Sequence, residues 1–360
     1  MSKQVVSLVK YDRRGASSRV RFWNLVPELR KRGWDIAVHP LLSDDILSRF
    51  YARGRHGYAG LVWHLLKRIK TLVSMGTPKI IWVEKEILPG LPGGLEKMVA
   101  GSWGDRLVVD YDDAVFLNYS DAWAGQLGRT QKFKDYARDA ACITVGSESL
   151  NEQMISWGCA RTKRIPSTVD VGLYPVHRHQ DSRPVVIGWI GTPRTVHFLE
   201  HLRDVFPVVA RKFDLQIRII GASWSCPGVD VRTVPWTKET EAAAVSSLDI
   251  GVMPLLDGPW ERAKCGYKLI QYMAAGVVPV GADIGENRVI IREGFNGYLA
   301  SEPADWVEKL SRLCGDVRLR AAIGEKARET ALERYDVRVA VEAMDGIFSE
   351  VVRRSEEASR

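Results

Sequence analysis

Residues 250–280 decide the fold, and they read IGVMPLLDGPWERAKCGYKLIQYMAAGVVPV. The apolar runs at 250–255 and 277–281 have the composition of strands that are buried on both faces of a sheet. Between them, Gly266 and Gly276 bracket an apolar segment with the length and spacing of a helix. Strand, helix and strand in this order predict a right-handed crossover in a parallel sheet.

The same alternation runs through the rest of the 360 residues. Candidate strands in the first half lie at 5–9, 36–41, 80–84, 107–111 and 142–146. Those in the second half lie at 185–190, 216–220 and 229–234, besides the two runs quoted above. The apolar spacing of 21–33 and the glycine at its end predict a helix between the first two strands. The pattern predicts an α/β protein with two doubly wound domains.

A polar, proline-containing segment at 171–181 separates the two halves and is predicted to be an inter-domain linker. We expect one Rossmann-like domain at 1–170 and a second at 182–340. A charged helix at 341–360 is expected to cross back to the first domain. Ligands of such sheets bind at the carboxyl ends of the strands, which is where the functional residues should lie.

The composition is that of an ordinary globular protein, with 46% hydrophobic and 26% charged residues. No apolar run approaches the roughly 20 residues that span a bilayer, and the start of the sequence reads as a first strand rather than a signal peptide. The five cysteines are scattered and form no CxxC pair, which argues against a disulfide framework or a zinc site. We therefore expect a cytoplasmic protein.

The positive charge is concentrated in the first half, where residues 1–170 carry 26 Lys and Arg against 18 Asp and Glu. This half also contains the basic amphipathic stretch 61–72, LVWHLLKRIKTL. Such a helix either lies on an anionic membrane, through Lys67, Arg68 and Lys70, or packs its apolar face into the core. A peripheral contact with the inner membrane face is therefore one expectation, and a core helix is the alternative.

The start of the helix at 266–276 has the properties of a phosphate site. A helix N-terminus offers free N–H groups and a positive dipole end. Lys264 and Lys268 are four residues apart, so both can flank that end. The alternative is a surface helix with two solvated lysines, but the glycine-containing, basic entry at a strand end favours diphosphate binding.

Residues 264–276, KCGYKLIQYMAAG, closely resemble the donor-site helix of the group 1 (family 4) glycosyltransferases of GT-B fold. Other segments resemble family motifs in the same order along the chain: 15–19, 165–170, 188–195 and 293–299. The resemblance implies a GT-B fold, in which two Rossmann-like domains face each other across a cleft. It also implies transfer of a sugar from a nucleotide-diphosphate sugar, most simply a UDP- or GDP-sugar, with retention of configuration.

The resemblance implies roles for individual residues. Those expected at the donor are Gly15, Thr192, Arg194, Gly221, Ser223, Trp236, Glu261, Lys264, Gly266, Tyr267, Lys268 and Gln271. Those expected to act in catalysis are Asp112, Asp113, Lys268 and Arg194, and those expected at the acceptor are Ser17, Ser18, Arg19 and Glu84. The acceptor would be a saccharide or lipid-linked hydroxyl compound in cell-surface glycan synthesis, with no nucleic acid partner. Because the helix end and basic side chains would neutralise the leaving diphosphate, neither a metal nor a separate cofactor is expected.

Asp110, Asp112 and Asp113 form a segment that resembles the metal-holding D-x-D of the other glycosyltransferase fold. The surrounding motifs favour GT-B instead, so Asp112 or Asp113 is expected to contact sugar hydroxyls. Helix capping is the alternative for Asp113, as it is for Ser17 and Ser18.

The sequence departs from the family where two glutamates, spaced E-x7-E, are common. Ala263 and Gln271 stand at these positions, and Glu261 is the nearest substitute. The departure leaves open a second interpretation, a nucleotide-sugar-binding protein with weak or no turnover. Another GT-B enzyme, such as a sugar-nucleotide epimerase, is disfavoured by the segments 165–170 and 264–276.

Overall fold

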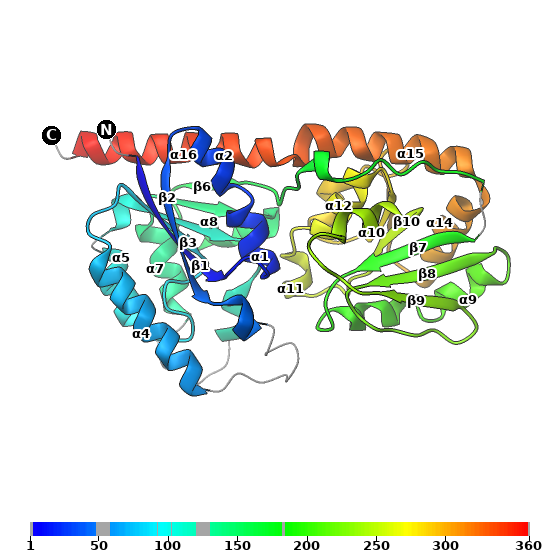
Figure 1. The fold of residues 1–360 in the computed structure, drawn as a ribbon, viewed down its shortest axis with the longest axis horizontal. Helices are drawn as coiled ribbons and strands as arrows, with labels where there is room; N and C mark the ends of the chain where they lie inside the picture. Colours follow the sequence, from blue (N-terminus) through cyan, green and yellow to red (C-terminus); the bar gives the residue numbers. More distant parts are fainter. Residues whose placement is uncertain are drawn as a thin grey trace. The chain divides into compact units, whose positions relative to one another are not determined.

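The computed structural model describes residues 3–47, 58–91, 93–101, 103–119, 130–181 and 184–358. Its contacts divide the chain into two compact units, one formed by Met1–Pro166 with Ala340–Arg360 and the other by Ser167–Val339. Each unit contains a six-stranded sheet in which all neighbouring strands are parallel (Figure 1). The predicted fold class, two Rossmann-like α/β domains, is confirmed.

The sheet of the first unit has the order β2-β1-β3-β4-β5-β6. Its strands are β1 (Gln4–Tyr11), β2 (Asp35–Leu42), β3 (Ile80–Glu84), β4 (Leu107–Tyr111), β5 (Cys142–Val145) and β6 (Thr162–Arg164). The helical segments of this part of the chain are α1 (Ala16–Ser18), the π-helical η1 (Arg19–Trp23), α2 (Val26–Lys31), α4 (Tyr58–Ser74), α5 (Gly93–Gly101), η2 (Gly104–Arg106), η3 (Val115–Tyr119), α7 (Gln131–Asp139) and α8 (Glu148–Ser156). Because β1 has β2 on one side and β3 on the other, the carboxyl ends of β1 and β3 flank a topological switch point.

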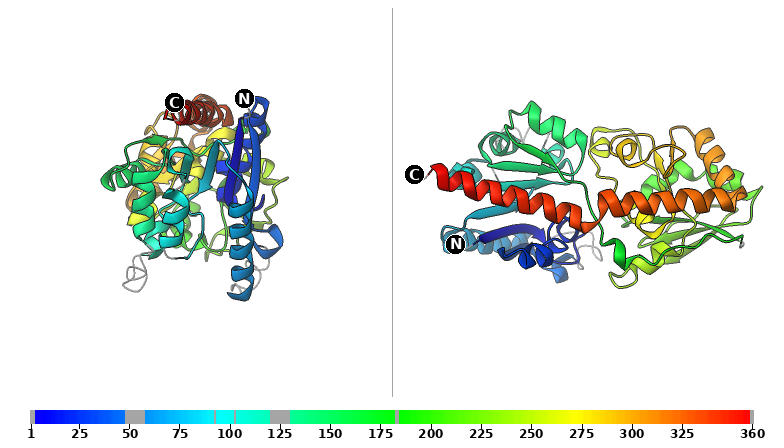
Figure 2. Two further views of the ribbon diagram at one scale, coloured as in Figure 1. Left: turned by 90° about the vertical axis from the view of Figure 1, so that its left-hand side faces the viewer. Right: turned by 90° about the horizontal axis from the view of Figure 1, so that it is seen from above.

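The end of the chain packs on this first unit through α16 (Val337–Ala358), drawn in red in Figure 2. Phe348 of α16 is fully buried, and its ring lies 5.2 Å from Trp34 and 5.4 Å from Trp82. Trp82 of β3 is itself stacked against Phe22 at 4.1 Å. These aromatic side chains bury a large apolar area, so the last helix is part of the first unit's core.

The sheet of the second unit has the order β12-β11-β10-β7-β8-β9. Its strands are β7 (Val185–Ile190), β8 (Leu215–Ile220), β9 (Asp230–Val234), β10 (Ile250–Met253), β11 (Val278–Ala282) and β12 (Tyr298–Ala300). Its helical segments are η4 (Val171–Leu173), η5 (Val196–Leu202), α9 (Val205–Ala210), α10 (Glu241–Ser246), α11 (Pro259–Arg262), α12 (Tyr267–Ala275), α13 (Asn287–Ile290), α14 (Pro303–Gly315), α15 (Val317–Thr330) and the π-helical η6 (Ala331–Tyr335). Here the switch point lies between β7 and β10.

Two buried clusters show that helices cover both faces of this sheet. Ile187 and Trp189 of β7 belong to a cluster that includes Phe206 of α9 and Leu310 of α14. Ile190 of β7 belongs to a second cluster, which contains the buried side of α12. Because successive side chains of a strand point to opposite faces, the two clusters lie on opposite sides of the sheet. The apolar runs of the sequence reflect this burial on both faces.

All ten predicted strands are present, and two further strands were missed. These are β6 and β12, each three residues long and each at the edge of its sheet. The segment 171–181, expected to be a linker, lies in the second unit, where Val171 and Tyr174 are buried in its core. Within the described ranges, no helix has both the length and the apolar character needed to cross a membrane.

Candidate functional site

The carboxyl ends of β7 and β10 are neighbours at the switch point of the second unit. β7 continues into the loop 191–195, whereas β10 leads through α11 to α12. Open parallel sheets bind ligands at such a position, because the two connections run to opposite faces of the sheet and leave a crevice. The loop after β7 and the start of α12 are therefore where ligand-binding groups are expected.

The nine-residue helix α12 starts at a glycine in the left-handed conformation. Gly266 has φ +63°, and no side chain caps the helix. A Cβ at this position would lie 2.1 Å from Cδ1 of Ile290, so any other residue would meet both backbone strain and a clash. An uncapped N-terminus presents backbone N–H groups and the positive end of the helix dipole to an anion.

Lys264 and Lys268 flank this helix start, and within the described ranges neither has a carboxylate partner. Their ammonium groups lie over aromatic rings, 5.1 Å from the Trp189 centroid for Lys268 and 5.8 Å from the Phe198 centroid for Lys264. Burial, together with the charge of Lys264, lowers the pKa of Lys268 from 10.5 to about 8. An anion placed between two partly buried cations that repel each other would stabilise both.

The loop after β7 supplies a third cation, Arg194, which is exposed. The loop is a tight turn in which the N–H of Thr195 donates to the carbonyl of Thr192 at 2.9 Å. Gly191 precedes it, and a Cβ there would lie 2.4 Å from the ring of Trp189. Since Trp189 also contacts Lys268, this one tryptophan joins the loop to the start of α12.

The predicted nucleotide-binding turns follow β8 and β9, further along the same edge. Gly221 has φ +85°, and a Cβ there would lie 2.5 Å from the carbonyl oxygen of Gly191. Ser223 is exposed. Trp236 is partly buried, and its indole N–H donates to Glu241 at 2.7 Å. A contact between Trp236 and a nucleotide base would therefore use the ring rather than the N–H group.

The positions of the family's two glutamates are both buried. Ala263 is apolar, and Gln271 donates its Nε2 hydrogen to the hydroxyl of Tyr174 at 3.2 Å. Glu261, on the single turn α11, is partly buried and retains a carboxylate. Gln271 is thus held within the fold, whereas Glu261 remains the candidate for contacts to the donor.

In the first unit, side chains that follow β1, β3 and β4 gather at the carboxyl edge of the sheet. The Ser17 hydroxyl lies 2.9 Å from Glu84 Oε1 and 2.6 Å from Asp112 Oδ2. The Ser18 hydroxyl donates to Glu84 Oε2 at 2.5 Å. A hydroxyl has one proton, so Ser17 donates to only one of its two carboxylate neighbours at a time. Four of the predicted residues are therefore brought together.

Lys85 completes this cluster, directly after Glu84, and the segment 84–86 at the end of a strand was a weaker candidate for the acceptor site. Its Nζ lies 2.7 Å from Asp112 Oδ1 and donates to Ser17 Oγ at 3.0 Å. Burial alone would lower the pKa of Lys85, but Asp112 and Glu84 raise it above its ordinary value. Lys85 has φ +63°, a conformation that costs a non-glycine residue about 1–3 kcal/mol and is typical of functional sites. The signal in the sequence that pointed to Lys85 was its position directly after a buried strand.

The aspartates of the D-x-D-like segment are paired with cations of the chain itself. Arg21 binds Asp110 through two hydrogen bonds of 2.9 and 2.6 Å, and Lys85 binds Asp112. Burial would raise the pKa of Asp112, but Lys85 and Ser17 lower it overall. Asp113 is partly buried and accepts the N–H of Ala114 at 3.1 Å, just before η3. This pairing supports the interpretation that the segment is not a metal site.

Two further predicted residues of this unit are closely packed. Gly15 starts α1, and a Cβ there would lie 2.2 Å from Cβ of Tyr11. Arg19 is buried in η1. Contacts of Gly15 and Arg19 with substrate stay predictions. The close packing against Tyr11 is by itself a reason for a glycine at position 15.

The helix α4 corrects one expectation. Arg68 is not a surface cation: it is 4% exposed, and its guanidinium donates to the carbonyls of Val9 and His39 at 2.7 and 3.0 Å. A different face of α4 exposes the apolar side chains Trp63, Leu66, Ile69 and Val73. Lys67 and Lys70 are also exposed. The helix therefore packs on the core with one face and presents apolar and basic side chains to its surroundings with another.

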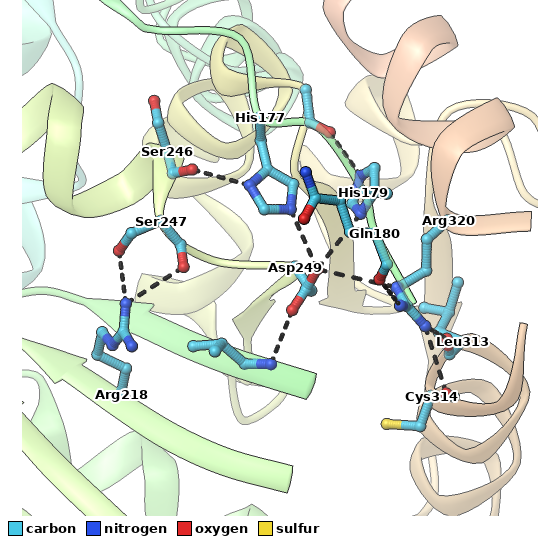
Figure 3. A network of polar contacts seen from close by, with 12 residues as sticks. His177, His179, Gln180, Arg218, Ser246, Ser247, Asp249, Leu313, Cys314 and Arg320 are labelled. Atoms are coloured by element: carbon cyan, nitrogen blue, oxygen red, sulfur yellow. Dashed lines mark hydrogen bonds and ion pairs between the residues drawn. The ribbon is translucent and has the colours of Figure 1, made fainter. Parts of the chain in front are cut away.

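Among the described residues, one group of side chains has the spacing of metal ligands. It consists of His177, His179 and Asp249, and it is drawn in Figure 3. Asp249 directly precedes β10, at the amino edge of the second unit's sheet. The lysines at α12 follow the carboxyl end of that strand.

Comparisons with known proteins bear on the family and the fold. Residues 184–316 match the family described as "Glycosyl transferases group 1". A search of curated proteins gives no significant match. Sucrose-phosphate synthase from Thermosynechococcus elongatus is similar in structure, with a TM-score of 0.75 and 12% identity over 98% of this chain and 100% of that chain.

Two other solved structures have the same fold. Anabaena HepE, in complex with UDP and glucose, has a TM-score of 0.70 and 13% identity over 97% of this chain and 100% of that chain. WaaG, a glycosyltransferase involved in lipopolysaccharide biosynthesis, has a TM-score of 0.62 and 12% identity over 96% of this chain and 99% of that chain. At these identities, the likeness establishes the fold.

Proposed function

Because residues 184–316 belong to the group 1 glycosyltransferase family and the chain has the GT-B fold, we propose that this protein transfers a sugar from a nucleotide-diphosphate sugar to a hydroxyl acceptor. The observation that carries the proposal is the pair Lys264 and Lys268 at the glycine-started N-terminus of α12. A diphosphate supplies the anion that relieves their mutual repulsion. HepE is bound to UDP, which favours a uridine nucleotide, and a guanosine nucleotide is the other candidate.

The proposed reaction proceeds with retention of configuration. The acceptor oxygen bonds to the anomeric carbon, the bond from that carbon to the diphosphate oxygen breaks, and the acceptor's proton passes to the leaving phosphate on the same face. Lys268, Arg194 and the N–H groups of α12 would stabilise the negative charge that develops on the diphosphate, without a metal ion. The cluster of Ser17, Glu84 and Asp112 would orient the hydroxyl groups of the sugars.

The donor site is tested by calorimetry with UDP and GDP. Charged hydrogen bonds contribute roughly 1.5–3 kcal/mol, so Lys268→Ala and Arg194→Ala should each weaken binding about tenfold or more. Lys212→Ala is the matched control, because Lys212 is an exposed lysine of the same unit in the turn that follows α9. Unchanged affinity in both folded site variants would contradict the assignment.

We further propose that the acceptor is a saccharide or lipid-linked compound used in cell-surface glycan synthesis, and that the enzyme works in the cytoplasm at an anionic membrane. Two features support a membrane contact: the basic excess of residues 1–170 and the exposed apolar side chains of α4. Apolar side chains flanked by Lys67 and Lys70 suit a helix that lies in the headgroup layer.

A second candidate function is binding of a nucleotide sugar without turnover. Ala263 stands at one of the family's two glutamate positions, and Gln271, at the other, donates a hydrogen bond to Tyr174. The donor site therefore lacks both carboxylates, which favours this candidate. Incubation with UDP- and GDP-sugars in the absence of acceptor separates the two candidates, because an active enzyme hydrolyses its donor slowly. Tight UDP binding with neither hydrolysis nor transfer would favour the binding protein.

A further inference from the structure

The histidines of the segment 171–181 are fixed by contacts far along the chain. His177 Nδ1 lies 2.9 Å from the carbonyl of Ser246, and His179 Nε2 lies 3.0 Å from the carbonyl of Gly276 (Figure 3). The other nitrogen of each ring faces the same carboxylate oxygen, Asp249 Oδ1. That distance is 3.1 Å from His177 Nε2 and 3.6 Å from His179 Nδ1.

Every ring nitrogen of this pair therefore faces an acceptor. A neutral imidazole has one N–H group, and the two backbone carbonyls, which can only accept, take one from each ring. The remaining nitrogen lone pairs then point at the lone pairs of Asp249. His179 Nδ1 has no hydrogen-bond partner among the described residues, and its side chain is 3% exposed. A cation among these three groups would give His179 Nδ1 the partner that it lacks.

A metal ion placed among these three groups would contact both imidazole nitrogens and the carboxylate oxygen. Arg320 Nε lies 3.9 Å from the same oxygen. Zinc ligands at about 2.0–2.1 Å in a tetrahedron lie roughly 3.3 Å apart. The two nitrogens lie 3.1 and 3.6 Å from Asp249 Oδ1, and all three atoms lie within 4.8 Å of one another.

The surroundings are those of a metal site as well. Histidines that bind a metal usually donate their other N–H to a backbone carbonyl, and ligating carboxylates accept a further hydrogen bond. Both conditions hold, because Asp249 Oδ2 accepts the N–H of Val186 at 2.9 Å. The His177 side chain is 15% exposed, so this side of the group is in contact with solvent.

We propose that His177 Nε2, His179 Nδ1 and Asp249 Oδ1 bind a divalent transition-metal ion of the zinc class. Two imidazoles and one carboxylate suit zinc or cobalt better than magnesium or calcium. The site lies at the amino end of the four-residue strand β10, which is about 13 Å long at 3.3 Å per residue, whereas the chain leads to the lysine site from the carboxyl end of that strand. Its role is to hold the segment 171–181 against α10, α12 and β10, and it takes no part in the transfer reaction.

Metal-free protein, prepared with a chelator and then dialysed, is titrated with zinc chloride and followed by thermal unfolding. A ligand that binds the native state at about 100 times its Kd raises the unfolding midpoint by roughly 5 °C or more in a domain of this size. Magnesium should give no shift. Cobalt chloride should give the visible absorption of a four-coordinate ion, and zinc should abolish it.

The variants His177→Ala and Asp249→Asn should lose the zinc shift and the cobalt spectrum. His201→Ala is the control, because His201 is an exposed histidine of the same unit. If both ligand variants fail to fold, the wild-type cobalt spectrum still decides the question. The proposal is overturned if zinc neither raises the unfolding midpoint of the wild type nor abolishes its cobalt absorption. It is also overturned if Asp249→Asn shows the same zinc shift and the same cobalt spectrum as the wild type. Neither readout depends on glycosyl transfer.

Discussion

Lys268 makes nucleotide binding depend on pH. Its pKa of about 8 reflects burial and the neighbouring Lys264, and a diphosphate would favour the charged form and raise that pKa. Affinity for UDP should therefore be highest near pH 7 and should fall as the pH rises through about 8, because binding then requires uptake of a proton. The diphosphate itself is fully ionised in this range, since a terminal phosphate has a pKa of about 6.

Calorimetry between pH 7 and 9, in buffers of different ionisation enthalpy, measures both the affinity and the proton uptake. Lys268→Arg is the matched variant, because an arginine keeps its charge over this range. It should bind UDP with an affinity that no longer varies with pH. A wild-type affinity as flat as that of the arginine variant would contradict a lysine of lowered pKa at the diphosphate.

At the scale of the element, the start of α12 depends on Gly266. An alanine there would adopt φ +63° and would also place its Cβ 2.1 Å from Ile290. Backbone strain and overpacking together should lower the free energy of unfolding by about 2–4 kcal/mol. Gly228→Ala is the control, because Gly228 has φ +75° but nothing within 4 Å of the added Cβ. If urea unfolding shows that both variants lose the same free energy of unfolding, the Ile290 side chain moves aside without cost and overpacking does not contribute.

The exposed face of α4 predicts binding to anionic membranes. Each lysine near such a surface contributes about 1 kcal/mol, so the double variant Lys67→Glu, Lys70→Glu should reduce partitioning onto phosphatidylglycerol vesicles about tenfold or more. Trp63→Ser should reduce it by removing apolar contact. Lys163→Glu, on the edge strand β6, is the control for charge alone.

Co-sedimentation at low and at high salt measures this partitioning. Screening should weaken wild-type binding to anionic vesicles, and vesicles of neutral lipid should bind less protein at both salt concentrations. Equal binding of wild type and the double glutamate variant would remove α4 from the proposal.

At the scale of the whole molecule, a metal ion is expected to contribute to stability and not to catalysis. Transfer activity should survive EDTA, because α12, Lys268 and Arg194 take the place of a metal at the diphosphate. EDTA should nevertheless lower the unfolding midpoint if the histidine site holds zinc. Activity is therefore measured well below that midpoint. Loss of activity that magnesium or manganese restores would contradict the GT-B mechanism and would favour a metal at Asp110–Asp113.

The sequence by itself determined the elements whose signals are local. The runs at 80–84, 107–111 and 185–190 became strands with those bounds, because short apolar runs of this kind suit strands that are buried on both faces of a sheet. Gly266 and Gly276 became the two caps of α12, since both adopt positive φ. The family resemblance rested on the same local segments.

The tertiary structure decided what depends on partners distant in sequence. β6 has no apolar residue and β12 has an apolar run of only three, and both are strands because β5 and β11 offer free edges. Arg68 has the local pattern of a surface cation, but the carbonyls of Val9 and His39 accept its hydrogens inside the protein. Lys85 belongs to a polar cluster only because the fold brings Ser17 and Asp112 next to its ammonium group.

The histidine site shows the same limit most clearly. The sequence has no CxxC pair, and scattered cysteines argued against a zinc site. His177 and His179 are two residues apart, but Asp249 follows 70 residues later and reaches them only because β10 starts beneath the segment 171–181. Local patterns fix which residues are strand, helix or turn, whereas convergence of side chains on one point is fixed by packing, which no short stretch of sequence contains.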